Sequence, residues 1–328
     1  MSYARIAKAV AETPWAITRE KLDEIESILS FHMEGGKFTA EELRARIGEP
    51  QRAVSAKRGA VAVIPLHGVI SHRMGGMTEM SGGISTERFT QMFREAMADD
   101  SISAIIADID SPGGTIAGVT ELHAEIMRAR GQKKLISHIN GLGASAAYWI
   151  ASAFDEIWAT PSASVGSIGI IASHIDTSKA DEREGITRTT FTAGKYKGEG
   201  HGPLSDEARA ATQARIDEAY AGMTADIGGA RGVDASVVRA GYGEGRVVSA
   251  KSAKKLAMID KIGTFEDLVG KLSGRRGVVT GMRAEGETVE LLAEAPEVEA
   301  VAEAIEAMVA RAEEGAVVDD LRQRLERF

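Results

Sequence analysis

The chain has 328 residues, 44% of them apolar, no cysteine, and a net charge of −9 from 39 Lys and Arg against 48 Asp and Glu. This apolar share is ordinary for a packed protein and excludes disorder throughout the chain. The lack of cysteine excludes a disulfide scaffold, a thiol nucleophile and a Cys-ligated metal site. A negative charge without a long run of Lys or Arg disfavours nucleic acid as a partner, because binding would require phosphate neutralisation.

The apolar residues form no long uninterrupted run. The first 25 residues contain no stretch of the length that a signal-peptide core requires. No run elsewhere approaches the roughly 18 residues that span a bilayer. We therefore expect no membrane anchor and a location in the cytoplasm.

Residues 1–58 are predicted to be a small helical appendage with a linker at its end. Leu22, Ile25 and Leu29 recur at helical spacing. The polar stretch GEPQRAVSAKRG that follows is typical of a connection between domains.

Residues 59–272 are predicted to form one α/β domain. Short β-branched runs alternate here with helical patterns, which indicates parallel β-α-β units with right-handed crossovers. The predicted strands are 60–66, 103–110, 134–140, 156–160 and 167–173, and the predicted helices are 86–98, 117–130 and a small-residue helix from about 145.

Residues 273–328 are predicted to be a linker and an acidic helical tail. Residues 285–314 hold ten Glu against one Arg, and Val298, Val301, Ile305 and Met308 repeat at coiled-coil spacing. Such a segment is too polar to form its own core, so we expect it to dock on a partner or on another copy. The alternative is a solvated helical extension with no further role.

Two glycine-rich turns follow neighbouring predicted strands. The turn 111–114 (SPGG) follows one strand, and the turn 141–145 (GLGAS) follows the next and leads into a helix. Ligands collect at the carboxyl ends of strands in an open α/β sheet. The Gly114 and Ala146 amides are placed to hold one oxyanion, as acyl transfer requires, with Ser145 as nucleophile. The simpler alternatives are a plain turn and a helix N-cap role for the serine.

Glycine also marks where a substrate could lie against the backbone. Gly113 and Gly143 have no Cβ atom, so an extended chain can approach them closely. We take them as candidate substrate-binding positions.

A serine nucleophile needs a base, and the sequence offers several candidate bases. His174 with Asp176 could complete a triad. A lysine could serve if apolar surroundings kept its amine neutral, and Lys195 and Lys197 lie in the long glycine-rich loop 192–205. Spacing alone does not choose among them.

The motifs AVIPLHGVIS, SPGG, GASAAYWIAS, SVGSIGI and TAGKYKGEG, in this order over about residues 60–272, resemble the signal peptide peptidase A family of serine peptidases. The resemblance implies a Clp/crotonase-type α/β fold and a Ser-Lys dyad that needs neither metal nor cofactor. Matched by motif, Ser145 is the nucleophile, Lys197 the general base and Ser167 the serine that helps orient the lysine. Lys195 stays open as an alternative base.

The resemblance also covers the oxyanion hole, which it assigns to the amides of Gly114 and Ala146. Family members often have Ser-Gly-Gly where this chain has Ser-Ala-Ala, a change that keeps the backbone donors. In the family, base and nucleophile can come from neighbouring subunits. This implies a homo-oligomer with active sites between its subunits.

Within the family, the chain is most similar to the capsid-assembly proteases of tailed phages, whose peptidase domain precedes a helical, scaffold-like extension. This implies an endopeptidase that cleaves scaffold and head proteins inside a prohead, and its own tail as well. The alternatives are a cytoplasmic peptidase that degrades peptides, a crotonase-like enzyme that binds coenzyme A, and a non-catalytic assembly scaffold that retains the fold.

Overall fold

The computed structural model describes residues 10–33, 56–58, 60–73, 83–183, 185–187, 189–199 and 202–272. All of them belong to one compact unit, Ser2–Gly277. The predicted acidic tail lies outside the described residues, and so does the centre of the glycine-rich loop 72–85.

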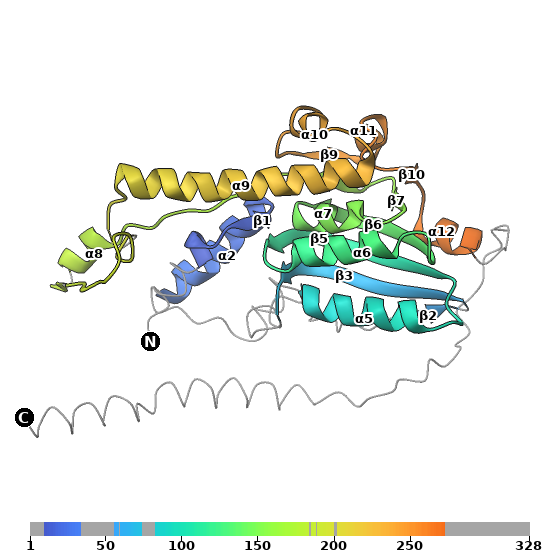
Figure 1. Ribbon diagram of the computed structural model, residues 1–328, viewed down its shortest axis with the longest axis horizontal. Coiled ribbons are helices and arrows are strands. Elements are labelled where there is room, and N and C mark those ends of the chain that lie inside the picture. Colours follow the sequence, from blue (N-terminus) through green and yellow to red (C-terminus); the bar gives the residue numbers. More distant parts are fainter. Residues whose placement is uncertain are drawn as a thin grey trace, which may run out of the picture. The chain divides into compact units, whose positions relative to one another are not determined.

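A mostly parallel β-sheet forms the centre of this unit (Figure 1). Its main path runs β10-β7-β6-β5-β3-β2, and neighbours along it are parallel except for β2 with β3. The strands of this path are β2 (Ala56–Arg58), β3 (Val61–Ser71), β5 (Ala104–Thr115), β6 (Lys134–Ala144), β7 (Glu156–Ala159) and β10 (Lys261–Ile262). Short strands join it at the sides: β1 (Trp15–Ile17), β4 (Ile84–Ser85), β8 (Ser164–Gly166) and β9 (Val247–Ser249).

Helices cover both faces of the sheet. The larger hydrophobic core lies under α5, α6, α7 and part of α9, and a smaller one lies under α12. Alternate residues of β3 face each layer: Ala62 and Ile64 belong to the larger core, Val61 and Val63 to the smaller. The helices are α2 (Arg19–Met33), α5 (Thr86–Ala98), α6 (Val119–Ala129), α7 (Ala146–Ser152), α8 (Ser178–Arg183), α9 (Asp206–Arg231), α10 (Ala235–Gly241), α11 (Ala250–Lys255) and α12 (Phe265–Leu272).

The structure confirms the predicted α/β fold and differs from the expected elements in two places near the glycine-rich turns. The SPGG stretch is not a turn: β5 continues through it, because Gly113 and Gly114 pair with Val69 and Ile70 of β3. The predicted strand 167–173 is not a continuous strand: β8 ends at Gly166, and beyond it only an isolated bridge at Ile171 follows.

The N-terminal region also differs from the helical expectation. Besides α2 it contains β1, which pairs antiparallel with the end of β5. Trp15, Ile17, Leu22 and Leu29 share a buried apolar cluster with Val69 of β3. This segment is therefore packed into the same unit as the sheet.

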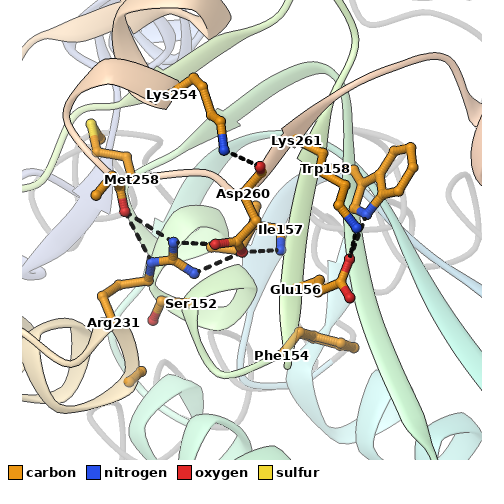
Figure 2. A network of polar contacts seen from close by, with 12 residues as sticks. Ser152, Phe154, Glu156, Ile157, Trp158, Arg231, Lys254, Met258, Asp260 and Lys261 are labelled. Atoms are coloured by element: carbon orange, nitrogen blue, oxygen red, sulfur yellow. Dashed lines mark hydrogen bonds and ion pairs between the residues drawn. The ribbon is translucent and has the colours of Figure 1, made fainter.

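A partly buried ion pair ties the end of α9 to the sheet (Figure 2). The Arg231 guanidinium donates to both carboxylate oxygens of Asp260 at 2.8 and 3.0 Å and to the carbonyl of Ala257. Asp260 also accepts the Ile157 amide of β7 at 2.7 Å. Burial alone would raise the pKa of Asp260, but these partners hold it below its usual value.

Candidate active site

Ser145 lies at a sharp turn where β6 ends and α7 begins. Its backbone has φ 55° and ψ −116°, a conformation that costs a residue with a Cβ atom on the order of 1–3 kcal/mol. The residue is fully buried. Strain of this kind is typical of active sites, and a nucleophilic serine on a strained strand-to-helix turn is a known arrangement.

The hydroxyl of Ser145 does not cap α7, although the residue occupies the N-cap position. It accepts no hydrogen bond from the described amides of that helix. Instead its Oγ lies 3.4 Å from the carbonyl of Gly169, and its backbone N–H donates to the carbonyl of Gly166 at 2.7 Å. The simple capping role considered for this serine is therefore not supported, and its hydroxyl lies against the segment that follows β8.

The SPGG strand and the start of α7 meet beside this serine. A Cβ atom placed on Gly113 would lie 3.1 Å from the Ala146 amide nitrogen and 2.1 Å from the carbonyl oxygen of Ala16. A Cβ atom on Gly114 would lie 1.8 Å from the Ile70 carbonyl. Gly113 thus lies next to the Ala146 amide. Close backbone packing requires glycine at both position 113 and position 114.

Gly143, the other candidate for substrate binding, has a clear packing reason to be glycine. It pairs with Ser111 of β5 and with Val165 of β8. A Cβ atom there would come within 2.7 Å of the Ile139 side chain. Its role toward a substrate stays a prediction.

Ser167 is the second serine of the candidate site with a left-handed backbone. Its φ is 52°, it is 9% exposed, and its N–H donates to the carbonyl of Arg246 at 2.9 Å. Ser167 directly follows Gly166, whose carbonyl accepts the hydrogen bond from the Ser145 N–H. This hydrogen bond joins the backbone segments that carry the two serines. Such placement is compatible with a group that positions a base near Ser145.

The two candidate lysines lie in the loop before α9, and both are exposed. Lys195 Nζ contacts the Tyr196 hydroxyl at 2.7 Å and Glu207 at 3.4 Å. Within the described part of the chain, no hydrogen bond joins the Lys197 ammonium to Ser145. Figure 1 shows this loop near the N-terminal end of α9, whereas α7 packs against α9 nearer its other end. Among the described residues, the structure therefore does not bring Lys197 and Ser145 together.

The histidine alternative does not form a triad. His174 uses Nε2 toward the Gly202 carbonyl at 2.8 Å and Nδ1 toward Glu12 at 3.3 Å. Asp176 instead accepts hydrogen bonds from Ser178. Neither is directed at Ser145 in the part of the chain that the structure describes.

Sequence reasoning missed the segment closest to these groups, namely β1. Trp15, Ala16 and Ile17 run alongside the SPGG strand. Three residues are too few to show the alternation that predicts a strand, and the neighbouring pattern is helical.

Comparison with known proteins gives a consistent result. Residues 128–278 match peptidase family S49. The chain is 33% identical over 193 residues to the head-tail preconnector protein GP5 of Enterobacteria phage P21, covering 58% of this chain and 38% of that protein. It is 26% identical over 275 residues to capsid assembly protease C of Escherichia phage lambda, covering 80% and 62%. Protease 4 of Salmonella typhi is 27% identical over 219 residues, covering 65% and 34%.

These matches confirm the family resemblance seen in the motifs. The chain spans less than two thirds of the length of each of these relatives. Among the helices that the structure describes, none has the length and apolarity needed to cross a membrane.

Proposed function

The chain contains a peptidase family S49 domain, and on this premise we propose that it is a serine endopeptidase with Ser145 as its nucleophile. The observation that carries the proposal is the strained, buried Ser145 beside Gly113 and the Ala146 amide, with a hydroxyl that does not cap the helix. A nucleophile needs this combination of fixed position and neighbouring amide donors.

The proposed reaction proceeds through an acyl-enzyme. Neutral Lys197 removes the proton from Ser145 as the hydroxyl attacks the peptide carbonyl, and the amides of Gly114 and Ala146 hold the oxyanion. Protonated Lys197 then gives its proton to the leaving amine, and water hydrolyses the ester with the same base. One oxyanion donor lowers the barrier by on the order of 3 kcal/mol.

Lys197 is proposed to reach Ser145 from a neighbouring copy of the chain, with Ser167 orienting the amine. Two observations support this. Lys197 is exposed in its own chain. The part of α9 that follows its loop, residues 209–222, contains no buried residue and offers a surface to a second copy.

The proposed substrates are proteins of a phage head under assembly. The support is the similarity to a capsid assembly protease and to a head-tail preconnector protein, each named for its place in a phage head. The proposed place of action is accordingly a prohead in the host cytoplasm.

Hydrolysis of an extended fluorogenic peptide tests the proposal. Ser145→Ala is expected to abolish turnover while the fold, followed by circular dichroism, persists. Ser152→Ala is the matched control, because Ser152 is equally buried on the same helix but its hydroxyl donates to the Trp149 carbonyl at 2.7 Å. Full activity in Ser145→Ala, or equal loss in both variants, would remove Ser145 from the role of nucleophile.

A further inference from the structure

Strand β1 lies between two backbone segments that border Ser145. On one side Trp15, Ala16 and Ile17 pair with Thr115, Gly114 and Gly113 of β5. On the other side Trp15 exchanges two backbone hydrogen bonds with Ile171, at 2.8 and 2.9 Å. β1 therefore lies between β5 and the segment at Ile171 and pairs with both.

The register places one peptide group of β1 at the candidate oxyanion hole. Thr18 N–H donates to the Pro112 carbonyl at 2.9 Å. Hydrogen-bonded pairs recur at every second residue of an antiparallel ladder, so Ala16 and Gly114 also form a pair of that type. The Gly114 amide thus faces the carbonyl of Ala16 and not open space.

The second oxyanion donor lies close to the same carbonyl. Gly113 separates the Ala16 oxygen from the Ala146 amide: a Cβ atom on this glycine would be 2.1 Å from the first and 3.1 Å from the second. The carbonyl oxygen of Ala16 therefore lies near the Ala146 amide, and Ala16 pairs with Gly114; the amides of Ala146 and Gly114 are proposed to hold the oxyanion. This is the place that the reacting carbonyl of a substrate must occupy.

Burial shows that β1 fills this place. Ala16 and Ser145 are both 0% exposed, and β1 already pairs with Gly113 and Gly114, so no second strand can pair with these residues from that side while β1 is present. β1 is held by apolar anchors at its ends: Trp15 and Ile17 pack in a buried cluster, and the Trp15 indole N–H donates to the Val10 carbonyl at 2.7 Å.

We propose that β1 is a built-in occupant of the substrate-binding groove. A substrate binds as an extended strand between Gly114 and Ile171, with a small residue where Ala16 lies, and β1 has to leave before it can bind. The inference rests on the proposed function, because it takes Ser145 as the reacting group. It gives the enzyme a closed form in which its own chain covers the serine.

A binding experiment tests this without requiring catalysis. In full-length Ser145→Ala protein, fluorescence anisotropy measures binding of a labelled peptide with the sequence of residues 10–18. Adding Trp15→Ala removes an anchor of β1 and is expected to tighten binding of the peptide at least tenfold. Leu29→Ala is the matched control, because Leu29 belongs to the same apolar cluster but lies in α2 and not in β1. It is expected to leave the affinity within about twofold.

A second variant keeps the inference testable if the Trp15→Ala protein does not fold. Ala16→Pro removes the ladder N–H of residue 16 and should also free the groove. A peptide carrying Trp in place of Ala16 is expected to bind at least tenfold more weakly, because the position is enclosed. Equal affinity in all folded variants, or indifference to the residue at this position, would overturn the inference. Tight binding by the Trp15→Ala variant, together with absent hydrolysis when Trp15→Ala is made in the Ser145-containing protein, would instead contradict only the proposed function.

Discussion

The two lysines of the loop before α9 differ in their surroundings, although they are two residues apart. Lys195 is engaged by Tyr196, both through the hydroxyl and through the ring face at 4.6 Å, and by Glu207. Within the part of the chain that the structure describes, the Lys197 side chain makes no comparable contact, and its backbone N–H donates to the Gly194 carbonyl at 3.1 Å.

Replacing each lysine by alanine separates their roles. Lys197→Ala is expected to lower kcat/KM for peptide hydrolysis at least about 100-fold, the contribution typical of a general base. Lys195→Ala is expected to retain most of the activity, because its ammonium contacts surface groups. Steady-state kinetics on the purified variants decides this, and the opposite pattern would assign the base to Lys195.

The sequence singles out the glycines of the two motifs, but the backbone shape around them is not predictable from it, and their roles toward a substrate stay predictions. The spacing of GLGAS before a helical pattern located Ser145. The left-handed backbone of this serine depends on how β6 meets α7, which no local pattern encodes. The distance of Lys197 from Ser145 likewise depends on the tertiary path of the loop, so the assignment of the dyad stays a prediction.

Around the site, local sequence patterns predict some elements correctly, whereas the bounds of others depend on pairing between distant segments. Helix α5 has the predicted bounds because an N-cap serine, Ser85, and a regular apolar face define it. β5 extends beyond its apolar run because β3 and β1 supply ladder partners for glycines with low strand preference. Pairing between distant segments cannot be deduced from the local sequence.

Close packing on β5 predicts a selective effect of small substitutions. Gly113 and Gly131 both have positive φ, 98° and 80°, so alanine strains the backbone at each. A Cβ atom on Gly131 meets nothing within 4 Å, whereas one on Gly113 collides with Ala16. We expect Gly113→Ala to lower the free energy of unfolding by about 1–3 kcal/mol more than Gly131→Ala. Urea unfolding measures the difference, and equal losses would show that Gly113 is not tightly packed.

The edge of the sheet at β7 and β10 carries a charge cluster that depends on pH. Burial would raise the pKa of Glu156, but hydrogen bonds from Lys134, Lys261 and Trp158 lower it to about 2. Figure 2 shows Glu156 with Lys261 and Trp158. A carboxyl whose pKa falls on folding stabilises the folded state above its unfolded pKa, and this stabilisation is lost as the pH falls toward the folded value.

Glu156→Gln tests this linkage. The variant is expected to be less stable than the wild type at pH 7, with the difference shrinking as the pH falls from about 4.5 to about 2. Denaturant unfolding at several pH values follows it. A difference that stays constant over this range would show that the ion pairs of Glu156 do not contribute to stability.

At the scale of the whole molecule, the described residues contain the central sheet and the buried Ser145, with Lys197 exposed in a loop that does not contact this serine. Residues 209–222 of α9, none of which is fully buried, and the loop with Lys197 extend from the part of α9 that packs on α7. A second copy that binds there would bring its own lysine to the serine of its neighbour. The catalytic site would then exist only in the oligomer.

Mixing two inactive variants tests this most directly. Ser145→Ala and Lys197→Ala proteins are mixed in equal amounts under conditions that let subunits exchange, and peptide hydrolysis is measured before and after. If serine and lysine act from neighbouring copies, activity returns to about one quarter of the wild-type level, because half of the serines are intact and half of their neighbours carry the lysine. A mixture in which subunits have exchanged but hydrolysis stays absent, while the wild type is active, would contradict a site shared between copies.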